Sequence, residues 1–504
     1  MSLKTSLLSV FITLLISNIY ASNLQYDPLL DPSVTIIQNT ERNDKGEFLW
    51  YPGQLSAHLQ RKRIEESAAR SLNVGYPGNF YSPECKTFFR KEIILKKETA
   101  VEWISTGEVN LVLNGNIQNY TSNSITLPKG RTELLFEVTT EKNLPSIKVS
   151  IDGEISVKGW MASLNGSYWT FAESSPVFGT SGRAPLDDPE IDVVINPVSI
   201  IAVRNSNVEG NKAVIRKNGY ILADFFHLEV GKVSFTAKGS GNLIAYVGES
   251  PEETLNENIA VFEQQPIEPY RLSQSGTEIV MPEMALRYLK LFSDGECEIS
   301  DLKFTAKMWP VDFLMAFECD NNEINNLWKA SVATLHTSTH GFYLDGIKRD
   351  YLPWSMDAVL STFGGDYVFG DKQVSLNSLS VALLPYNPQK SDMGIPDYPL
   401  HALIGFNQFY KRYGDFNSIL SYRDRMEQLL KFYETLQDER GFISANVGVS
   451  WGFVPGWATR QGPDRKGTPA YAQIMLYYNY KIGADFSEKW GDRSSASHYR
   501  KKAE

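Results

Sequence analysis

Acidic, basic and aromatic side chains gather in one short stretch of the chain, "DGIKRDYLPWSMD" at residues 345–357. Asp345, Asp350 and Asp357 supply three carboxyl groups, and Asp366 follows shortly afterwards. Hydrolysis of a glycosidic bond needs two carboxyl groups with different pKa values, because one protonates the leaving oxygen while the other acts at the opposite face of the sugar. The stretch therefore predicts acid–base chemistry on a glycoside.

The neighbours of these aspartates are suited to separating their pKa values. Lys348 and Arg349 can keep adjacent carboxylates ionised, whereas Trp354 desolvates the carboxyl group that it covers and so raises its pKa. A charged turn with an aspartate on a helix surface would show the same composition, because structural ion pairs also produce such clusters. The residues alone leave both interpretations open.

A helix is predicted to begin inside this stretch. Pro353 suits a first helical turn, where its missing N–H would have no partner anyway. Asp350 then lies just before the helix and Asp357 in its first turns, about two helical turns apart. We expect the carboxyl groups to converge in a concave, partly dry pocket lined by indole.

The rest of the chain separates into a strand-like part and a helical part. Short alternating runs with turn signals cover about 75–310 and predict β-sandwich modules, whereas apolar residues recur at helical spacing after Trp309-Pro310. We predict a multidomain β + α protein in which β-sandwich modules precede helical hairpins. The predicted segments are a signal peptide (1–21), an N-terminal segment (22–74), an accessory β-sandwich module (75–185), a β-sandwich domain (186–311) and a helical domain (312–504).

Glycine and apolar periodicity mark individual helices. The segment "GQLSAHLQRKRIEESAARSL" at 53–72 predicts one helix near the N-terminus. Gly414 and Gly483 follow apolar-periodic stretches, so each is predicted to be a C-cap glycine at which a helix ends.

The charge and the N-terminus limit the partners and the compartment. The formal net charge of −10 argues against nucleic acid or an anionic membrane as the main partner, because both require a basic face. Lys4, an apolar run from Leu7 to Ile16 and small or polar residues up to Ala21 form the plan of a secretory signal. No later stretch approaches about 18 apolar residues, so we predict no membrane span and an exported protein, periplasmic or secreted.

Other chemistries find less support in the sequence. His336 and His340 are spaced for one helix face but have no carboxylate at a matching offset, so we interpret them as packing or cleft residues. The three cysteines show no paired spacing, and we predict neither a metal nor a cofactor. "GVSWG" at 448–452, with His498 downstream, matches a serine-hydrolase elbow, but "FVPGW" follows where that elbow requires a helix.

Two tryptophans on a later loop are candidate sugar contacts. Trp451 and Trp457 bracket a Pro-Gly turn between helical stretches. Loop tryptophans serve as stacking platforms for ligands, and they also plug the ends of helical barrels. We place both among the candidate substrate-binding residues.

"DGIKRDYLPWSMD" resembles the signature of the bacterial α-L-rhamnosidases of glycoside hydrolase family 78, D-G/C-x-K/Q-R-D/E-x-x-x-W-x-G-D. Other segments resemble the same family in the same order: "MALRYLKLF" (284–292), "FECDNNEINNLW" (317–328), "GIPDYPLHALIGFNQFYKRYGD" (394–415) and "RKGTPAYAQIMLYYNY" (465–480). The resemblance covers roughly 190–504 and is weaker over 75–185.

The resemblance implies an (α/α)6 barrel after β-sandwich domains and inverting hydrolysis of terminal α-L-rhamnose from rhamnosides or polysaccharides. Asp350 stands where the family has its general acid. Asp345 and Asp357 match the acidic residues that bind the sugar and tune the site, and Trp354 matches the motif tryptophan. We place Arg349 among the substrate-binding residues as well.

Two departures from the family pattern bear on activity. Asp350 replaces the usual glutamate, which shortens the acid by one methylene, and Met356 replaces the motif glycine. About half of the twelve helices of such a barrel are found in 312–504, and the family's general base, a glutamate, has no counterpart. We therefore expect a fragment with the N-terminal half of the barrel and with uncovered apolar helix faces.

Three function hypotheses remain at this point. The first is a rhamnosidase-like glycosidase, whose activity in this chain is open. The second is a non-catalytic carbohydrate-binding protein derived from such an enzyme. The third is an (α/α)6 glycosidase for another sugar, because one fold hosts several specificities. The linkage, the aglycone, the oligomeric state and calcium binding leave no signature in the sequence.

Overall fold

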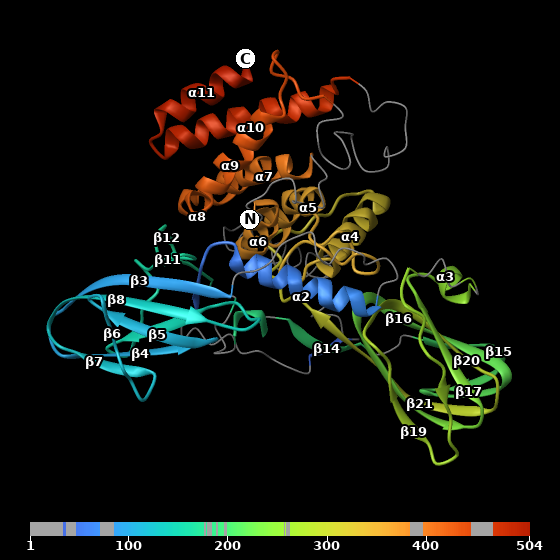
Figure 1. Ribbon diagram of the computed structural model, residues 1–504. Helices are drawn as coiled ribbons and strands as arrows, with labels where there is room; N and C mark the ends of the chain where they lie inside the picture. The colour runs from blue at the N-terminus through green and yellow to red at the C-terminus, as the bar shows by residue number, and fades with distance from the viewer. Residues whose placement is uncertain are drawn as a thin grey trace, which may run out of the picture.

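The computed structural model shows two β modules that spread apart below a helical part (Figure 1). It describes residues 34–36, 47–70, 85–175, 178, 184–187, 190–195, 199–256, 258, 263–383, 397–444 and 467–504. The predicted mixed β and helical fold is confirmed. Within the described residues, no helix is long and apolar enough to cross a membrane. The predicted signal peptide lies outside the described residues, and the domain boundaries stay a prediction.

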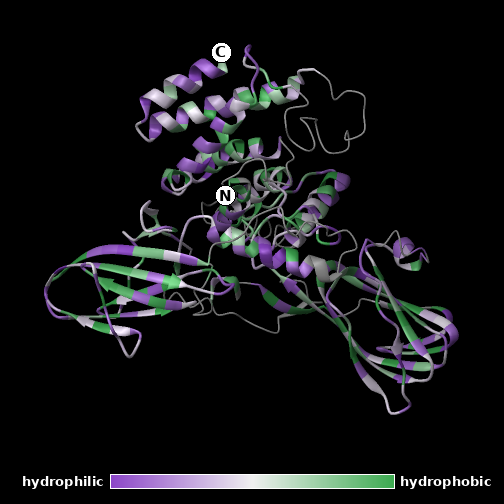
Figure 2. Cartoon of the chain, viewed as in Figure 1, coloured by the Kyte–Doolittle hydropathy of each residue, from purple (hydrophilic) through white to green (hydrophobic). Residues whose placement is uncertain are grey.

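The first β module packs two antiparallel sheets face to face around one core. The first sheet contains β13 (Glu173–Ser174), β2 (Leu49–Trp50), β9 (Ile147–Ile151), β4 (Thr99–Ser105), β7 (Ser124–Leu127) and β10 (Glu154–Ile155). The second contains β12 (Thr170–Phe171), β11 (Met161–Ser163), β3 (Lys86–Leu95), β8 (Gly130–Thr139), β5 (Glu108–Leu113) and β6 (Asn116–Ile117). Apolar and polar residues alternate along these strands (Figure 2), so Trp103, Phe136 and Trp160 meet in the core.

The second β module is one nine-stranded antiparallel sheet built around the 28-residue strand β16 (Lys212–Gly239). The other strands are β1 (Val34–Ile36), β14 (Ile191–Ile195), β15 (Ser199–Glu209), β17 (Asn242–Gly248), β18 (Tyr270–Arg271), β19 (Thr277–Val280), β20 (Met284–Ser293) and β21 (Cys297–Met308). The register of β16 against β20 shifts between Asp224 and Glu229, and Phe226 there has φ +70°. This bulge bends β16, whose first half also pairs with β15 and whose second half also pairs with β19, around one apolar core.

The helical part begins after the β21 strand. Its helices are α4 (Asn322–Thr337), α5 (Ser355–Val368), α6 (Lys372–Ser380), α7 (Tyr398–Tyr413), α8 (Phe416–Leu420), α9 (Arg423–Thr435), α10 (Ala470–Lys489) and α11 (Arg493–Ala503). Gly414 is the left-handed C-cap of α7, as predicted. The prediction for Gly483 was wrong, because this glycine lies inside α10, where it lets Leu430 and Tyr499 pack closely against the helix backbone.

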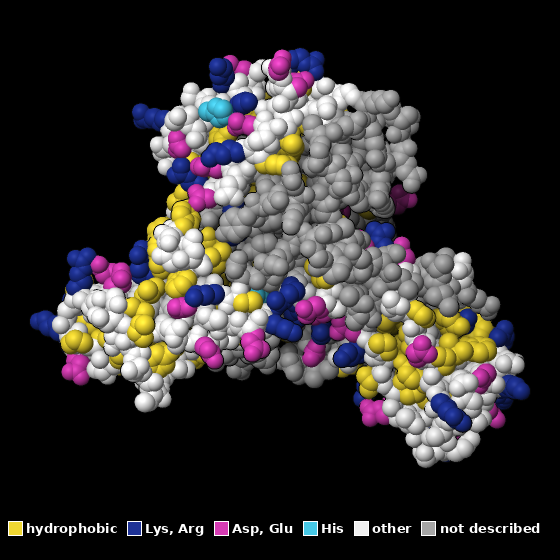
Figure 3. Space-filling view, in the orientation of Figure 1, with side chains coloured by type: hydrophobic (Ala, Val, Ile, Leu, Met, Phe, Trp, Pro, Cys, Tyr) yellow, Lys and Arg dark blue, Asp and Glu magenta, His cyan; other side chains and the backbone are white. Residues whose placement is uncertain are grey.

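Helix α2 (Gln54–Arg70), predicted from the sequence, lies across the junction between the β modules and the helices (Figure 1). One buried apolar cluster joins Leu55 and Leu59 of α2 to Ala285 of β20 and to Phe342 and Val374 of the helical part. The three parts therefore share a core, and the segment between residues 47 and 70 belongs structurally to all of them. On the face shown in Figure 3, acidic and basic side chains are interspersed over the surface.

Candidate active site

Residues 345–354 form an irregular loop that leads into helix α5. The Asp345 N–H donates a hydrogen bond to the Leu352 carbonyl (2.9 Å), and the Leu352 N–H donates to Asp345 Oδ1 (3.0 Å). These two bonds close the loop around Asp350. Helix α5 begins at Ser355, so Asp357 lies in its first turn as predicted, whereas Pro353 precedes the helix instead of starting it.

Asp350 is held at the centre of the loop by two N–H donors. The residue is only 5% exposed; its Oδ1 accepts from Arg349 Nε (3.0 Å) and its Oδ2 from Trp354 Nε1 (3.1 Å). Each carboxyl oxygen of Asp350 thus accepts at least one N–H group, one of them from a guanidinium, and the two contacts fix the orientation of the carboxyl group. The sequence-predicted residues Arg349, Asp350 and Trp354 are in direct contact.

Asp345 and Asp357 lie close enough to Asp350 for the three charges to affect one another. Burial, together with the negative charges of Asp350 and Asp357, raises the pKa of Asp345 to about 8. Burial and the charge of Asp350 also raise the pKa of Asp357 above its usual value. At neutral pH the cluster therefore retains a proton, which the raised pKa places on Asp345.

Asp366, near the C-terminal end of α5, does not join this cluster. Its Oδ1 accepts hydrogen bonds from the Ser375 hydroxyl and from Tyr413 Oη (3.0 Å), and its backbone carbonyl accepts from Arg412 Nε (2.9 Å). These contacts link α5 to α6 and α7, so the role of Asp366 is structural.

Lys348 also departs from the prediction, because it turns away from the aspartates. Its ammonium group forms an ion pair with Glu253 Oε1 (2.6 Å), and both side chains are about 15% exposed. Glu253 belongs to α3 (Pro251–Leu255), a short helix after β17. The contact fastens the motif loop to the second β module, and Arg349 supplies a cation to Asp350.

A buried network of ion pairs and hydrogen bonds around Arg63 of α2 contacts the motif loop at Tyr351. The sequence did not indicate this network. The Arg63 side chain is 2% exposed; it pairs with Glu66 (2.6 Å) and with Glu190 (2.6 Å) and donates to the His340 carbonyl (3.1 Å). It also reaches Tyr351 Oη (3.4 Å), whose residue has φ +57°. The only sequence signal was the run of basic residues in "QRKRIEE", which is ordinary for a solvated helix face.

A second group of titratable residues lies at the start of α7, where Tyr398 contacts Trp354. The indole ring of Trp354 meets Tyr398 edge-on, with 6.1 Å between the ring centroids. The adjacent Asp397 is 1% exposed, and burial raises its pKa to about 6. Tyr471 Oη, on α10, is 3.0 Å from His401 Nε2. Tyr398 is therefore an aromatic neighbour of the motif that the sequence analysis did not single out.

The remaining sequence candidates divide into two groups. His336 and His340 are buried as predicted: Nε2 of His336 is 2.7 Å from the Trp309 carbonyl, and Nδ1 of His340 is 2.8 Å from Glu190 Oε1. Among the described residues no group of His, Cys, Asp or Glu is arranged to hold a metal ion. Trp451, Trp457 and the "GVSWG" segment lie outside the described residues.

A family model described as "Alpha-rhamnosidase-like, bacteroidetes, N-terminal" matches residues 87–291. The predicted resemblance to bacterial rhamnosidases is thus confirmed at the level of the family. The match lies over the two β modules, whereas the motif resemblance was strongest further along the chain. No curated protein sequence gave a significant match.

Solved structures of rhamnosidases are similar to this chain at low sequence identity. The GH78 rhamnosidase of Bacillus sp. GL1 has 14% identity and a TM-score of 0.48, and the alignment covers 94% of this chain and 55% of that one. The rhamnosidase of Klebsiella oxytoca with rhamnose bound has 16% identity and a TM-score of 0.46, with 57% and 61% covered. The chain thus matches roughly three fifths or less of the length of either protein.

Proposed function

We propose that this chain is part of a glycoside hydrolase that releases terminal α-L-rhamnose from rhamnosides or polysaccharides by an inverting acid–base mechanism. The observation that carries the proposal is the cluster of Asp345 and Asp357 near Asp350, which accepts a hydrogen bond from the Trp354 indole, in a chain whose β modules match the rhamnosidase-like family model. A secretory-type N-terminus supports export of the protein to the periplasm or the exterior.

In the proposed mechanism, Asp350 donates a proton to the glycosidic oxygen. The raised pKa values of Asp345 and Asp357 keep a proton in the carboxyl cluster at neutral pH. This proton moves to Asp350 before the glycosidic bond is broken, and a proton from water replaces it after turnover. Arg349 and Trp354 orient the carboxyl group of Asp350 through its two oxygens. Inversion also requires a water-activating base, roughly 6.5–9.5 Å from the acid.

We further propose that the helices form the first half of an (α/α)6 barrel. Ile324 and Leu327 on α4 are 46% and 67% exposed, and Leu360, Phe363 and Tyr367 on α5 are 53%, 39% and 52% exposed. These positions recur at helical spacing, which supports packing of further helices on α4 and α5. Such helices would also bring the general base.

The test is release of rhamnose from an aryl α-L-rhamnoside, with the anomer of the first product followed by NMR. Activity that disappears in Asp350→Asn but persists in Asp320→Asn, an exposed aspartate outside the cluster, supports the proposal. The same assay is run on the chain extended by the coding sequence downstream of residue 504. Absence of rhamnose release from both proteins would refute the proposed function.

A further inference from the structure

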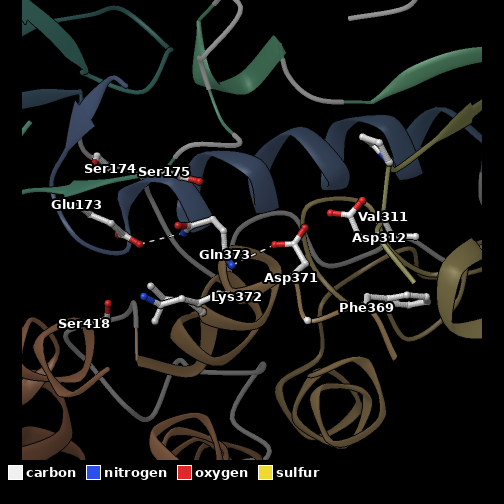
Figure 4. A pocket seen from close by; sticks show the side chains of 13 residues that line it. Glu173, Ser174, Ser175, Val311, Asp312, Phe369, Asp371, Lys372, Gln373 and Ser418 are labelled. Atoms are coloured by element: carbon white, nitrogen blue, oxygen red, sulfur yellow. Dashed lines mark hydrogen bonds between the residues drawn. The ribbon is translucent and has the colours of Figure 1, made fainter. Parts of the chain in front are cut away.

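A cavity of about 370 Å³ lies where the first β module, the linker before α4 and the helices meet (Figure 4). Its wall is built from β13, residues 310–312, the turn at 369–371, the start of α6 and Ser418 of α8. None of the residues that line it belongs to the 345–357 motif. The volume lies within the range of small-ligand sites, roughly 300–1,000 Å³.

One end of the cavity is a fixed polar floor. Glu173 Oε1 accepts from Gln373 Nε2 (3.0 Å), and its Oε2 accepts from the Gly53 N–H (3.2 Å). Gln373 Nε2 also donates to Asn377 Oδ1 (2.9 Å). Asp371 is fixed in the same way: its Oδ1 caps α6, and its Oδ2 accepts from Trp309 Nε1 (3.1 Å). These groups are held in place before any ligand arrives.

Other polar groups on the wall are accessible. Asp312 is exposed and has no hydrogen bond or ion pair to any residue in the described part of the chain. The Lys372 side chain is 46% exposed and forms an ion pair with Asp415. In Figure 4, Val311, Asp312 and Phe369 lie on one side of Asp371, while Lys372 lies on the other. A ligand in this space meets a carboxylate acceptor, an ammonium donor and apolar carbon.

The charge of the wall decides which class of ligand fits. Asp312 and Asp371 carry negative charge and the single lysine is already paired, so an anionic ligand such as a phosphate is disfavoured. A purely apolar ligand would displace water from the Asp312 carboxylate and the Lys372 ammonium group without replacing their hydrogen bonds. A molecule with several hydroxyl groups can donate hydrogen bonds to Asp312 and accept them from Lys372. Its C–H groups can contact Val311 and Phe369.

We propose that this cavity is a second, non-catalytic site for a small neutral saccharide. The class of ligand rests on the proposed function, because a sugar-releasing protein meets such molecules. Residues from the β module, the linker and the helices all contact the ligand, so its binding fastens the junction of these parts. The site is independent of Asp350.

The experiment measures binding of L-rhamnose, D-galactose and D-galacturonate to the full chain by saturation-transfer NMR and by the shift in melting temperature. We expect at least one neutral sugar to bind in the millimolar range and to raise the melting temperature by mass action. Asp312→Ala should weaken this binding about tenfold or more, because it removes hydrogen bonds to a charged group. The anionic D-galacturonate should bind more weakly than D-galactose.

The matched control is Asp320→Ala, which removes an exposed aspartate of the same linker that does not line the cavity. It should bind each sugar like the unaltered chain. Equal affinities in Asp312→Ala and Asp320→Ala, or no sugar binding at all, would overturn the proposal. Loss of hydrolysis in Asp350→Asn with sugar binding still sensitive to Asp312 would show that the two sites are separate, so the failure of either proposal is recognised on its own.

Discussion

Replacing Asp345 by asparagine should make the protein more stable at neutral pH. Burial raises the pKa of this carboxyl group from 3.8 to about 8 in the folded chain. Between these values the folded state binds one proton more than the unfolded state, so the free energy of unfolding falls as the pH rises. Asparagine is neutral throughout, and its Oδ1 can still accept the hydrogen bond that the Leu352 N–H donates to Asp345.

The size of the effect follows from the slope of this linkage. One proton changes the free energy of unfolding by about 1.4 kcal/mol per pH unit. Between about pH 5 and pH 7.5 the advantage of Asp345→Asn should therefore grow by roughly 3 kcal/mol. For a part of about 150–250 residues, this corresponds to an increase in melting temperature of roughly 6–12 °C.

The assay is the difference in melting temperature between Asp345→Asn and the unaltered chain, measured at several values between about pH 5 and pH 8. Other buried carboxyl groups with raised pKa values, such as Glu229 and Asp397, titrate in both proteins and cancel in the difference. The exposed substitution Asp320→Asn serves as the control and should show a flat difference. A difference for Asp345→Asn that is equally flat would refute the reasoning.

Three further substitutions test the packing around the site. Arg63→Met should lower the free energy of unfolding by about 3–5 kcal/mol in chemical denaturation, because it leaves the buried Glu190 without its cation. Gly365→Ala should destabilise the chain by roughly 1–3 kcal/mol in the same assay, because a Cβ there collides with the buried Tyr343 hydroxyl. Glu229→Gln should raise the melting temperature increasingly from about pH 5 to pH 8, because burial raises the pKa of Glu229 to about 8. An unchanged stability in any of the three would contradict the corresponding contact.

The sequence predicted the part of the site that depends on local spacing. Two helical turns between Asp350 and Asp357 and an aromatic ring between them were enough to expect convergence, because these distances are set within one loop and one helix. The C-cap at Gly414 followed from the same kind of local rule. The same rule wrongly predicted a C-cap at Gly483, because a glycine can also allow close packing against the middle of a helix.

The contacts that could not be predicted join residues far apart in the chain. Lys348 was assigned to the aspartates beside it, but its ammonium group forms an ion pair with Glu253 on another module. Asp366 is an aspartate close in sequence to the cluster, yet it accepts hydrogen bonds from Ser375 of α6 and Tyr413 of α7 instead. No spacing rule within one segment carries such information, because these partners are set by tertiary packing.

The buried Arg63 guanidinium makes the helical part dependent on α2, although the two β modules separate them in the sequence. A protein trimmed to residues 312–504 would lose both Arg63 and Glu190, and with them the hydrogen bonds that Arg63 donates to the His340 carbonyl and to Tyr351 Oη. Any minimal version of this protein must therefore retain residues 47–70. When N-terminal modules are exchanged between related proteins, the hybrid should fold only if α2 and the helical part come from the same protein.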